Sequence, residues 1–146
     1  MDDYSDIARR VVVLGLREGE RHQQIAYSTP LALHGIIAHE ENDAFRLLVD
    51  LVANVSELRD EVLVDLRRRA ALGGPERLPF TVNMKKALSV AMESAGSLGF
   101  NYVGILHILL GLVEVSEGTA GRILRSHSVT LEQVFSAVNE LEREAG

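Results

Sequence analysis

The stretch LGFNYVGILHILLGL, residues 98–112, decides how the rest of the chain is interpreted. The apolar residues in the second half of this stretch predict a buried helix over about residues 106–113. The same pattern occurs 76 positions earlier, and the two copies stay in step without a gap between residues 9 and 48. The matched pairs are Leu33 with Leu109, Gly35 with Gly111, Glu41 with Glu117, Ala44 with Ala120, Arg46 with Arg122 and Leu48 with Leu124.

These matches favour an internal repeat. Two unrelated amphipathic segments are the alternative, but they would not keep a glycine, an acid and an Ala-x-Arg-x-Leu pattern in register. We expect the first repeat at about residues 5–69 and the second at 80–144. The Gly-Gly-Pro turn chemistry in residues 70–79 marks the linker between them.

Each repeat is predicted to form four helices, which gives an all-α fold of about eight helices. No segment shows sustained period-two alternation, so no sheet is expected. Each repeat alone would expose an apolar face, and we therefore expect the two to pack about a pseudo-twofold axis. The seam between them, together with the first helix of each repeat, is the expected place for a groove.

Helix starts and buried faces follow from local signals. The first repeat is predicted to begin helices at about residue 6, at Thr29 as N-cap, at about residue 43 and after Asn54. The second is predicted to begin them after Thr81, at about residue 106, near residue 118 and after Thr130. The residues expected on buried faces include Ile7, Val11, Leu14, Met84, Leu88, Ala91 and Met92.

Length and composition narrow the class of protein. A chain of 146 residues with 47% hydrophobic and 25% charged residues suits one globular domain. The absence of cysteine excludes disulfides, thiolate zinc sites and a cysteine nucleophile, and it fits a cytoplasmic protein. The net charge of −6 argues against a nucleic-acid partner. No apolar run is long enough for a membrane span.

Three segments of the second copy resemble the Clp repeat. They are Phe80-Thr81-x-x-x-Lys85-Lys86-Ala87-Leu88, residues 98–112 and Glu117-Gly118-x-Ala120-x-Arg122-Ile123-Leu124. Residues 8–14, ARRVVVL, are similar to the opening of the ClpC-type N-terminal domain. The resemblance covers about residues 5–142, although the first copy is degenerate past residue 15.

The resemblance implies a double four-helix domain that docks substrates and adaptor proteins to Clp unfoldases. The chain has no G-x-x-x-x-G-K-[ST] phosphate loop, so we expect no ATP hydrolysis by that route and no enzyme activity. Two origins stay open at this point. The chain is either part of a longer unfoldase or a small free-standing member of the family.

Phosphoarginine recognition is expected to be lost. In ClpC-type domains the second helix of each repeat starts with Gly-Thr-Glu-His, and the resemblance implies that the glutamate binds phosphoarginine. Pro30 and Leu106 stand at these two positions. Each missing charge-assisted hydrogen bond is worth roughly 1.5–3 kcal/mol. Drift of unused sites is the alternative explanation.

The resemblance places a second surface on the first helices, which adaptors and cyclic-peptide antibiotics use in this family. The residues that fall there are Val13, Phe80, Lys85 and Leu88, with Arg9 and Arg10 nearby. Phe80 would be an apolar anchor and Lys85 a donor to peptide carbonyls. Alternatively, Phe80 packs back onto its own helix, and the four cations form solvated faces.

No metal site or cofactor is expected. Five histidines are present, but His34 and His39 are five residues apart and therefore do not share a helix face. Two hypotheses for function result. The first is a docking module that recruits substrates or an adaptor to a Clp unfoldase. The second is a free-standing decoy that binds Clp-directed cyclic peptides and protects the unfoldase.

Overall fold

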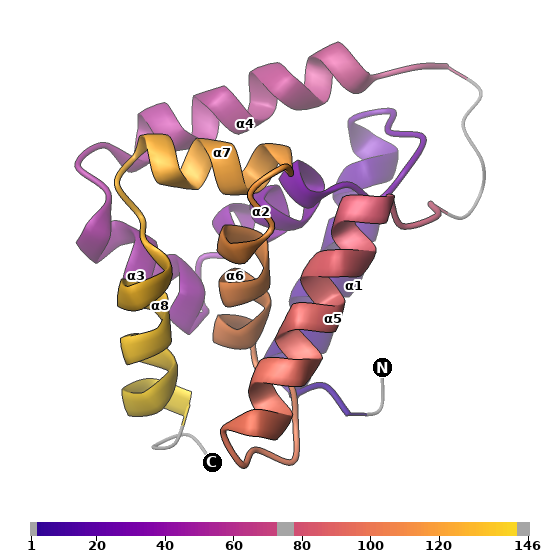
Figure 1. The fold of residues 1–146 in the computed structure, drawn as a ribbon. Coiled ribbons are helices and arrows are strands. Elements are labelled where there is room, and N and C mark those ends of the chain that lie inside the picture. Colours follow the sequence, from indigo (N-terminus) through magenta and orange to yellow (C-terminus); the bar gives the residue numbers. More distant parts are fainter. Residues whose placement is uncertain (1–2, 73–77, 143–146) are drawn as a thin grey trace.

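The computed structural model of the protein describes residues 3–72 and 78–142. These residues form eight α-helices and one π-helical turn, arranged as two four-helix sets (Figure 1). The helices are α1 (Asp6–Arg21), α2 (Thr29–Ala38), α3 (Asp43–Leu51), α4 (Val55–Arg69), α5 (Val82–Ser97), α6 (Ile105–Glu114), α7 (Thr119–Ser126) and α8 (Leu131–Ala137), followed by the turn Val138–Glu142. The predicted all-α fold is confirmed. Part of the expected linker, residues 73–77, and the end of the second repeat, residues 143–146, lie outside the described residues.

The first segment of the chain binds to the second repeat. Tyr4 forms an isolated parallel β-bridge with Val103, which lies two residues before the start of α6. The Ser5 N–H donates to the Val103 carbonyl at 2.9 Å, and the Val103 N–H donates to the Asp3 carbonyl at 2.7 Å. This bridge fixes the beginning of α1 against the beginning of α6.

An equivalent parallel bridge joins the segment before α5, in the second repeat, to the first repeat. Phe80 pairs with Tyr27, just before α2. The Thr81 N–H donates to the Tyr27 carbonyl at 3.1 Å, and the Tyr27 N–H donates to the Pro79 carbonyl at 2.8 Å. Every residue of this bridge is 76 positions from its counterpart in the first bridge. The repeat found in the sequence is therefore a pseudo-twofold relation in space.

Helices α2 and α6 form the centre of the molecule, with the other helices around them (Figure 1). Nearly every residue of both helices is buried, as expected for helices covered on all sides. Gly35 brings α2 close to α1, since a Cβ there would lie 3.3 Å from the Val11 carbonyl oxygen. Gly111 brings α6 even closer to α5, where a Cβ would collide with the Ala87 carbonyl.

Three expectations from local patterns need correction. Ser28, not Thr29, is the N-cap of α2, because the Ser28 hydroxyl accepts from the Leu31 N–H at 3.3 Å. Ile7 is 37% exposed and Met92 is 51% exposed, although both were expected on buried faces. Helices α1 and α5 bury a narrow stripe of mostly small residues, which lets neighbouring helices approach closely and leaves the flanking long side chains outside.

No helix in the described parts of the chain combines the length and apolar character needed to cross a membrane.

Substitution of Gly111 by alanine is expected to lower the free energy of unfolding by about 1–3 kcal/mol, because the new methyl group meets rigid backbone. Gly96→Ala is the matched control. Gly96 also lies in a helix, but a Cβ there has no neighbour within 4 Å, so alanine should raise the stability by up to about 1 kcal/mol. Urea unfolding measures both. Equal stabilities for the two variants would contradict the close approach of α5 and α6.

Candidate functional site

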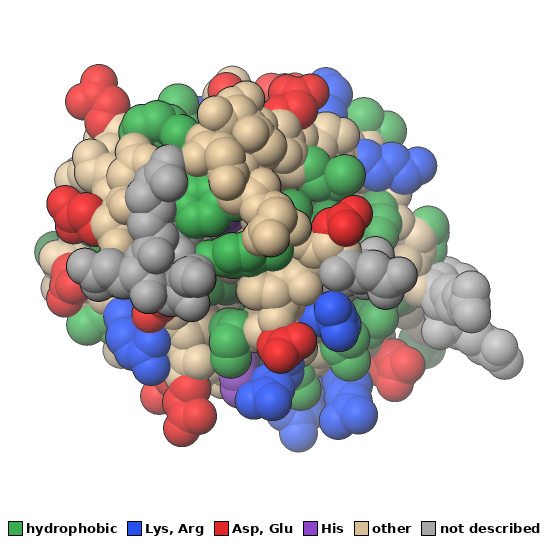
Figure 2. All heavy atoms as spheres, turned by 90° about the horizontal axis from the view of Figure 1, so that it is seen from below, with side chains coloured by type: hydrophobic (Ala, Val, Ile, Leu, Met, Phe, Trp, Pro, Cys, Tyr) green, Lys and Arg blue, Asp and Glu red, His purple; other side chains and the backbone are tan. Residues whose placement is uncertain are grey.

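A cleft of about 690 Å³ opens at the seam between the two repeats, where a groove was expected. It lies between the first turn of α1, the start of α3 and the start of α6. Its lining residues are Tyr4, Ser5, Asp6, Ile7, Arg9, Glu41, Asn42, Asp43, Arg46, Tyr102 and Ile105. Figure 2, which views the molecule from the lower side of Figure 1, shows acidic and basic side chains interspersed around hydrophobic ones.

The charges in this seam cleft are largely paired. Arg46 lies 2.8 Å from the Asp43 carboxylate, and both side chains are partly exposed. Arg9 donates to the Tyr4 carbonyl at 3.3 Å and lies 4.0 Å from Asp6. Such exposed pairs contribute little to stability. Acidic and basic side chains thus lie together with aromatic and aliphatic ones in the lining of this cleft. A lining of this mixed kind suits a peptide segment better than a single anion.

Two smaller clefts lie on the outer faces of α1 and α5 and are related by the repeat. The first, of about 300 Å³, is lined by Asp6, Arg9, Arg10, Val13, Leu14 and Arg17. The second, of about 480 Å³, is lined by Val82, Lys85, Lys86, Ser89, Val90, Glu93, Glu114, Val115 and Glu117. Six residues of the second cleft are the 76-shifted counterparts of all six in the first. The predicted site residues therefore divide between two equivalent clefts, with Arg9, Arg10 and Val13 in one and Lys85 in the other.

Phe80 and Leu88 line neither of these clefts. Phe80 is 36% exposed, and its ring lies 5.2 Å from that of Tyr27. The Tyr27 hydroxyl donates to the Val12 carbonyl at 3.1 Å, so the Phe80 ring is linked through Tyr27 to the middle of α1. The aromatic partner of Phe80 thus belongs to the first repeat rather than to its own helix. Leu88 is half-buried and packs against the core.

Lys85 and Arg10 have no ion pair or side-chain hydrogen bond with another described residue, and both are exposed. Lys86 differs, because its ammonium group lies 2.9 Å from Glu117. Val13 is 43% exposed. Next to these free cations the α1 and α5 faces expose apolar surface, which is the combination that the docking prediction requires.

Pro30 and Leu106, the two positions at which the resemblance to ClpC-type domains implies a glutamate, are both buried. The neighbouring Thr29 acts across the seam. Its hydroxyl accepts from the Ala120 N–H at 3.2 Å, and it thereby caps α7, whose own N-cap, Gly118, has no side chain to do so. An N-cap bond of this kind is worth about 1 kcal/mol.

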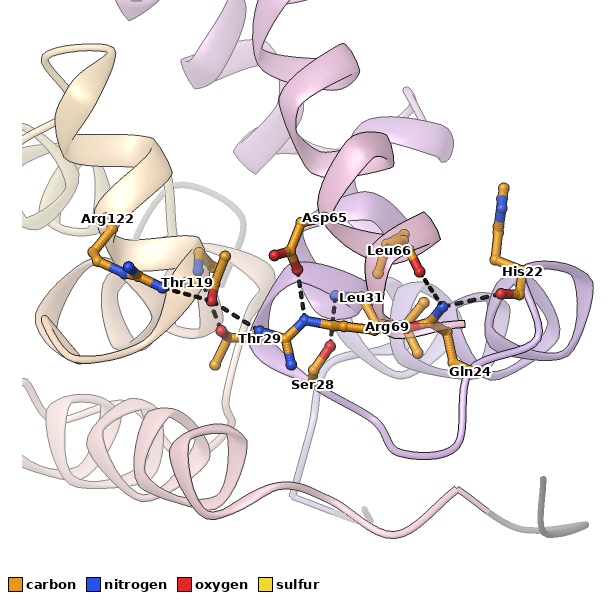
Figure 3. A network of polar contacts seen from close by, with 11 residues as sticks. His22, Gln24, Ser28, Thr29, Leu31, Asp65, Leu66, Arg69, Thr119 and Arg122 are labelled. Carbon is orange, nitrogen blue, oxygen red and sulfur yellow. Dashed lines mark hydrogen bonds and ion pairs between the residues drawn. The ribbon is translucent and has the colours of Figure 1, made fainter. Parts of the chain in front are cut away.

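A polar network surrounds this seam contact (Figure 3). Arg69, at the end of α4, lies 2.6 Å from Asp65 and donates to the Thr119 hydroxyl at 2.9 Å. Arg122 donates to the same hydroxyl at 3.0 Å. The buried Gln24 donates to the Leu66 carbonyl at 2.8 Å. These contacts join the end of α4 to the second repeat and to the α1–α2 loop.

His107 has a structural role at the start of α6. Its Nδ1 accepts from the Gly104 N–H at 2.9 Å, and its ring packs 4.8 Å from that of Phe100. The side chain is fully buried, and this burial lowers the pKa of His107 to about 4. The imidazole is therefore neutral at pH 7, with its proton on Nε2.

The sequence did not reveal several residues that join the two repeats. Tyr4 and Tyr27 form the bridges, and Thr29 caps a helix in the other repeat. The shift of 76 could have found the bridges, because it aligns Tyr4 with Phe80. The seam cap had no sequence signal, since it depends on how the repeats pack.

The stability of the protein is expected to fall on acidification because of His107. The pKa of His107 in the folded state lies below that of an unfolded histidine, so the unfolded chain binds the proton more readily. The contribution is fully present above about pH 6.5 and is lost as the pH falls to about 4, and it amounts to about 3 kcal/mol.

Urea unfolding between pH 4 and pH 7 checks this, with His107→Gln as the reference. Glutamine can still accept from the Gly104 N–H but does not titrate. The stability difference between the two proteins should grow with pH, whereas parallel pH profiles would contradict a buried neutral imidazole.

Comparison with known proteins agrees with this architecture. The sequence model of the Clp repeat (R) N-terminal domain matches residues 3–127 and 79–144. The "ATP-dependent Clp protease ATP-binding subunit ClpA homolog" of Guillardia theta is 31% identical over 138 residues, which cover 94% of this chain and 17% of that protein. "Chaperone protein ClpC1, chloroplastic" of Oryza sativa subsp. japonica is 32% identical over 123 residues, covering 84% of this chain and 13% of that protein.

Solved structures show the same fold. The Hsp104 N-terminal domain from Candida albicans has a TM-score of 0.79 at 16% identity, with 96% of this chain and 91% of that chain covered. The ClpD N-terminal domain from Arabidopsis thaliana has a TM-score of 0.72 at 21% identity, with 99% and 96% covered. The chain spans less than a fifth of the two curated relatives and nearly all of these solved domains. It belongs to the Clp repeat (R) N-terminal domain family.

Proposed function

We propose that this domain is a non-catalytic docking module that recruits extended protein segments, or an adaptor, to a Clp unfoldase in the cytoplasm. The observation that carries the proposal is the pair of repeat-related clefts on the outer faces of α1 and α5, together with the seam cleft. They place exposed apolar side chains beside unpaired cations. Unfolded segments offer apolar side chains and free carbonyls, which match those two features.

Phe80, which lies two residues before Val82 of the α5 cleft but does not line the cleft itself, is the proposed anchor for a bound segment. The ring is held by its contact with Tyr27, so little side-chain entropy remains to be lost on binding, yet a third of it stays exposed. Lys85 lies one turn into α5 and is free to donate to peptide carbonyls or to pair with acidic side chains. Leu88 supports this surface from the core side rather than contacting a ligand directly.

We further propose that phosphoarginine is not a ligand. A guanidinium group requires a carboxylate partner, and Pro30 and Leu106 offer none. Both side chains are buried, so neither position exposes a group that could replace the acid.

The decoy role is the alternative. Retention of Phe80 and Lys85 together with the loss of both acids is the pattern expected of a domain that binds Clp-directed cyclic peptides without handling marked substrates. The two roles differ in whether the domain also engages an unfoldase.

Phe80→Ala is expected to weaken binding of the domain to its partner by roughly tenfold or more, as anchor residues do. Fluorescence anisotropy of the labelled domain should be measured against casein, as an unfolded segment, and against the purified Clp unfoldase hexamer of the source organism. Phe135→Ala is the matched control, because Phe135 is 44% exposed but lies on α8.

Binding to casein or the hexamer that Phe80→Ala weakens and Phe135→Ala preserves supports docking. Tight binding of a Clp-directed cyclic peptide without either complex replaces docking with the decoy role. Equal effects of the two substitutions on binding would show that the outer faces of α1 and α5 are not the docking site.

Free phosphoarginine is expected not to bind at concentrations up to the millimolar range. Isothermal titration calorimetry tests this, with a ClpC-type domain that retains Gly-Thr-Glu-His in both repeats as the positive control. A dissociation constant in the low micromolar range for this chain would refute the proposed loss.

A further inference from the structure

Helices α1 and α2 bring together three metal-ligand side chains that are distant in the sequence. Glu18 lies in the last turn of α1, His22 is the C-cap residue directly after that helix, and His34 faces them from α2. The Glu18 Oε2 atom is 3.1 Å from the His34 Nε2 atom and 3.3 Å from the His22 Nε2 atom. All three ligand atoms lie within 4.8 Å of one another. We propose that Glu18, His22 and His34 bind one divalent transition-metal ion, with Zn²⁺ as the best match.

The spacing of the donors fits a tetrahedral ion. Zn²⁺ binds histidine nitrogen and carboxylate oxygen at about 2.0–2.1 Å, so neighbouring ligand atoms in a tetrahedral shell are about 3.3–3.4 Å apart. The two separations from Glu18 Oε2, 3.1 and 3.3 Å, are already close to this value, and the two histidine nitrogens lie within 4.8 Å of each other. Two imidazoles and one carboxylate also form a donor set that zinc proteins use, with a water or another ligand in the fourth position.

The surroundings leave room for that fourth ligand. The His34 side chain is 9% exposed and anchors the site, whereas those of Glu18 and His22 are 22% and 27% exposed and open it to solvent. Arg21 contacts the other carboxylate oxygen, Oε1, at 3.5 Å, whereas Oε2 faces the two histidine nitrogens that would share the metal with it. The positive charge of Arg59 disfavours a cation near His34. The Glu40 carboxylate lies 3.5 Å from the Arg59 guanidinium group and offsets part of that charge.

The second repeat shows that the packing here does not need these groups. The 76-shifted counterparts of Glu18, His22 and His34 are Ser94, Leu98 and Leu110. Leu110 is buried and Leu98 packs against the core, so apolar side chains occupy two of the three equivalent positions in the second repeat. Among the described residues, a carboxylate and two imidazoles converge in the first repeat alone, where a bound ion would join the end of α1 to α2.

The test uses the tag-free, metal-free protein at pH 7.5. Calorimetric titration with ZnCl₂ and metal analysis after dialysis should give one Zn²⁺ per chain. Saturating Zn²⁺ should raise Tm by roughly 5–10 °C at a hundred times the dissociation constant. Co²⁺ in the same site should give the visible absorption of a tetrahedral complex.

Glu18→Gln, His22→Gln and His34→Gln should each weaken Zn²⁺ binding at least tenfold and abolish the Co²⁺ spectrum. His127→Gln is the matched control, because His127 forms a similar pair with Glu61 at 3.2 Å but is not in a three-ligand cluster. Glu18 and His22 are partly exposed, so their variants should fold and should test the proposal even if the His34 variant does not fold. Absence of one-to-one binding, unchanged affinity in these variants or an equal loss in His127→Gln overturns the proposal.

Discussion

The exchange of main-chain hydrogen bonds between the two repeats is the constraint on which the rest of the structure depends. The segment before α1 pairs with Val103, and the segment before α5 pairs with Tyr27. Buried backbone groups need partners, and here each repeat supplies partners that the other repeat requires. The two four-helix sets are consequently joined by main-chain hydrogen bonds in both directions. The starts of α1 and α6 are held side by side, and this arrangement creates the seam cleft.

The glycine contacts then determine which helices can carry function. Gly35 and Gly111 let α1 and α5 approach α2 and α6 so closely that the central pair is buried almost completely. A helix without an exposed face presents little surface to a protein partner. The surfaces open to such a partner include the outer faces of α1 and α5, where the two related clefts lie, the seam, and a cleft of about 560 Å³ between α4 and α7. The burial of Leu106, inside the central helix α6, is a result of the same packing.

Features that depend on neighbouring residues were predictable from the sequence, and those that depend on packing were not. Thr81 and Thr130 cap their helices as expected, because a cap needs only the residue three positions on. Thr29 was assigned to its own helix but caps α7 instead. Helical periodicity shows the direction of the buried face but not its width, and Ile7 and Met92 therefore proved to be exposed. The convergence of Glu18 with His34 was likewise invisible, since a loop separates them.

The two repeats keep the same backbone while their side chains diverge. Gln23 has a φ of 53° and its counterpart Gly99 a φ of 83°, so both copies make the same left-handed turn, although only the second has a glycine there. This conformation is unfavourable for a residue with a side chain, and the hydrogen bond from the Ala71 N–H to the Gln23 carbonyl, at 3.0 Å, helps to hold it in place. The α1–α2 junction differs in the same way from the α5–α6 junction, because ionisable groups stand in the first repeat where the second has Ser94 and two leucines. One backbone arrangement thus accommodates two different sets of side chains.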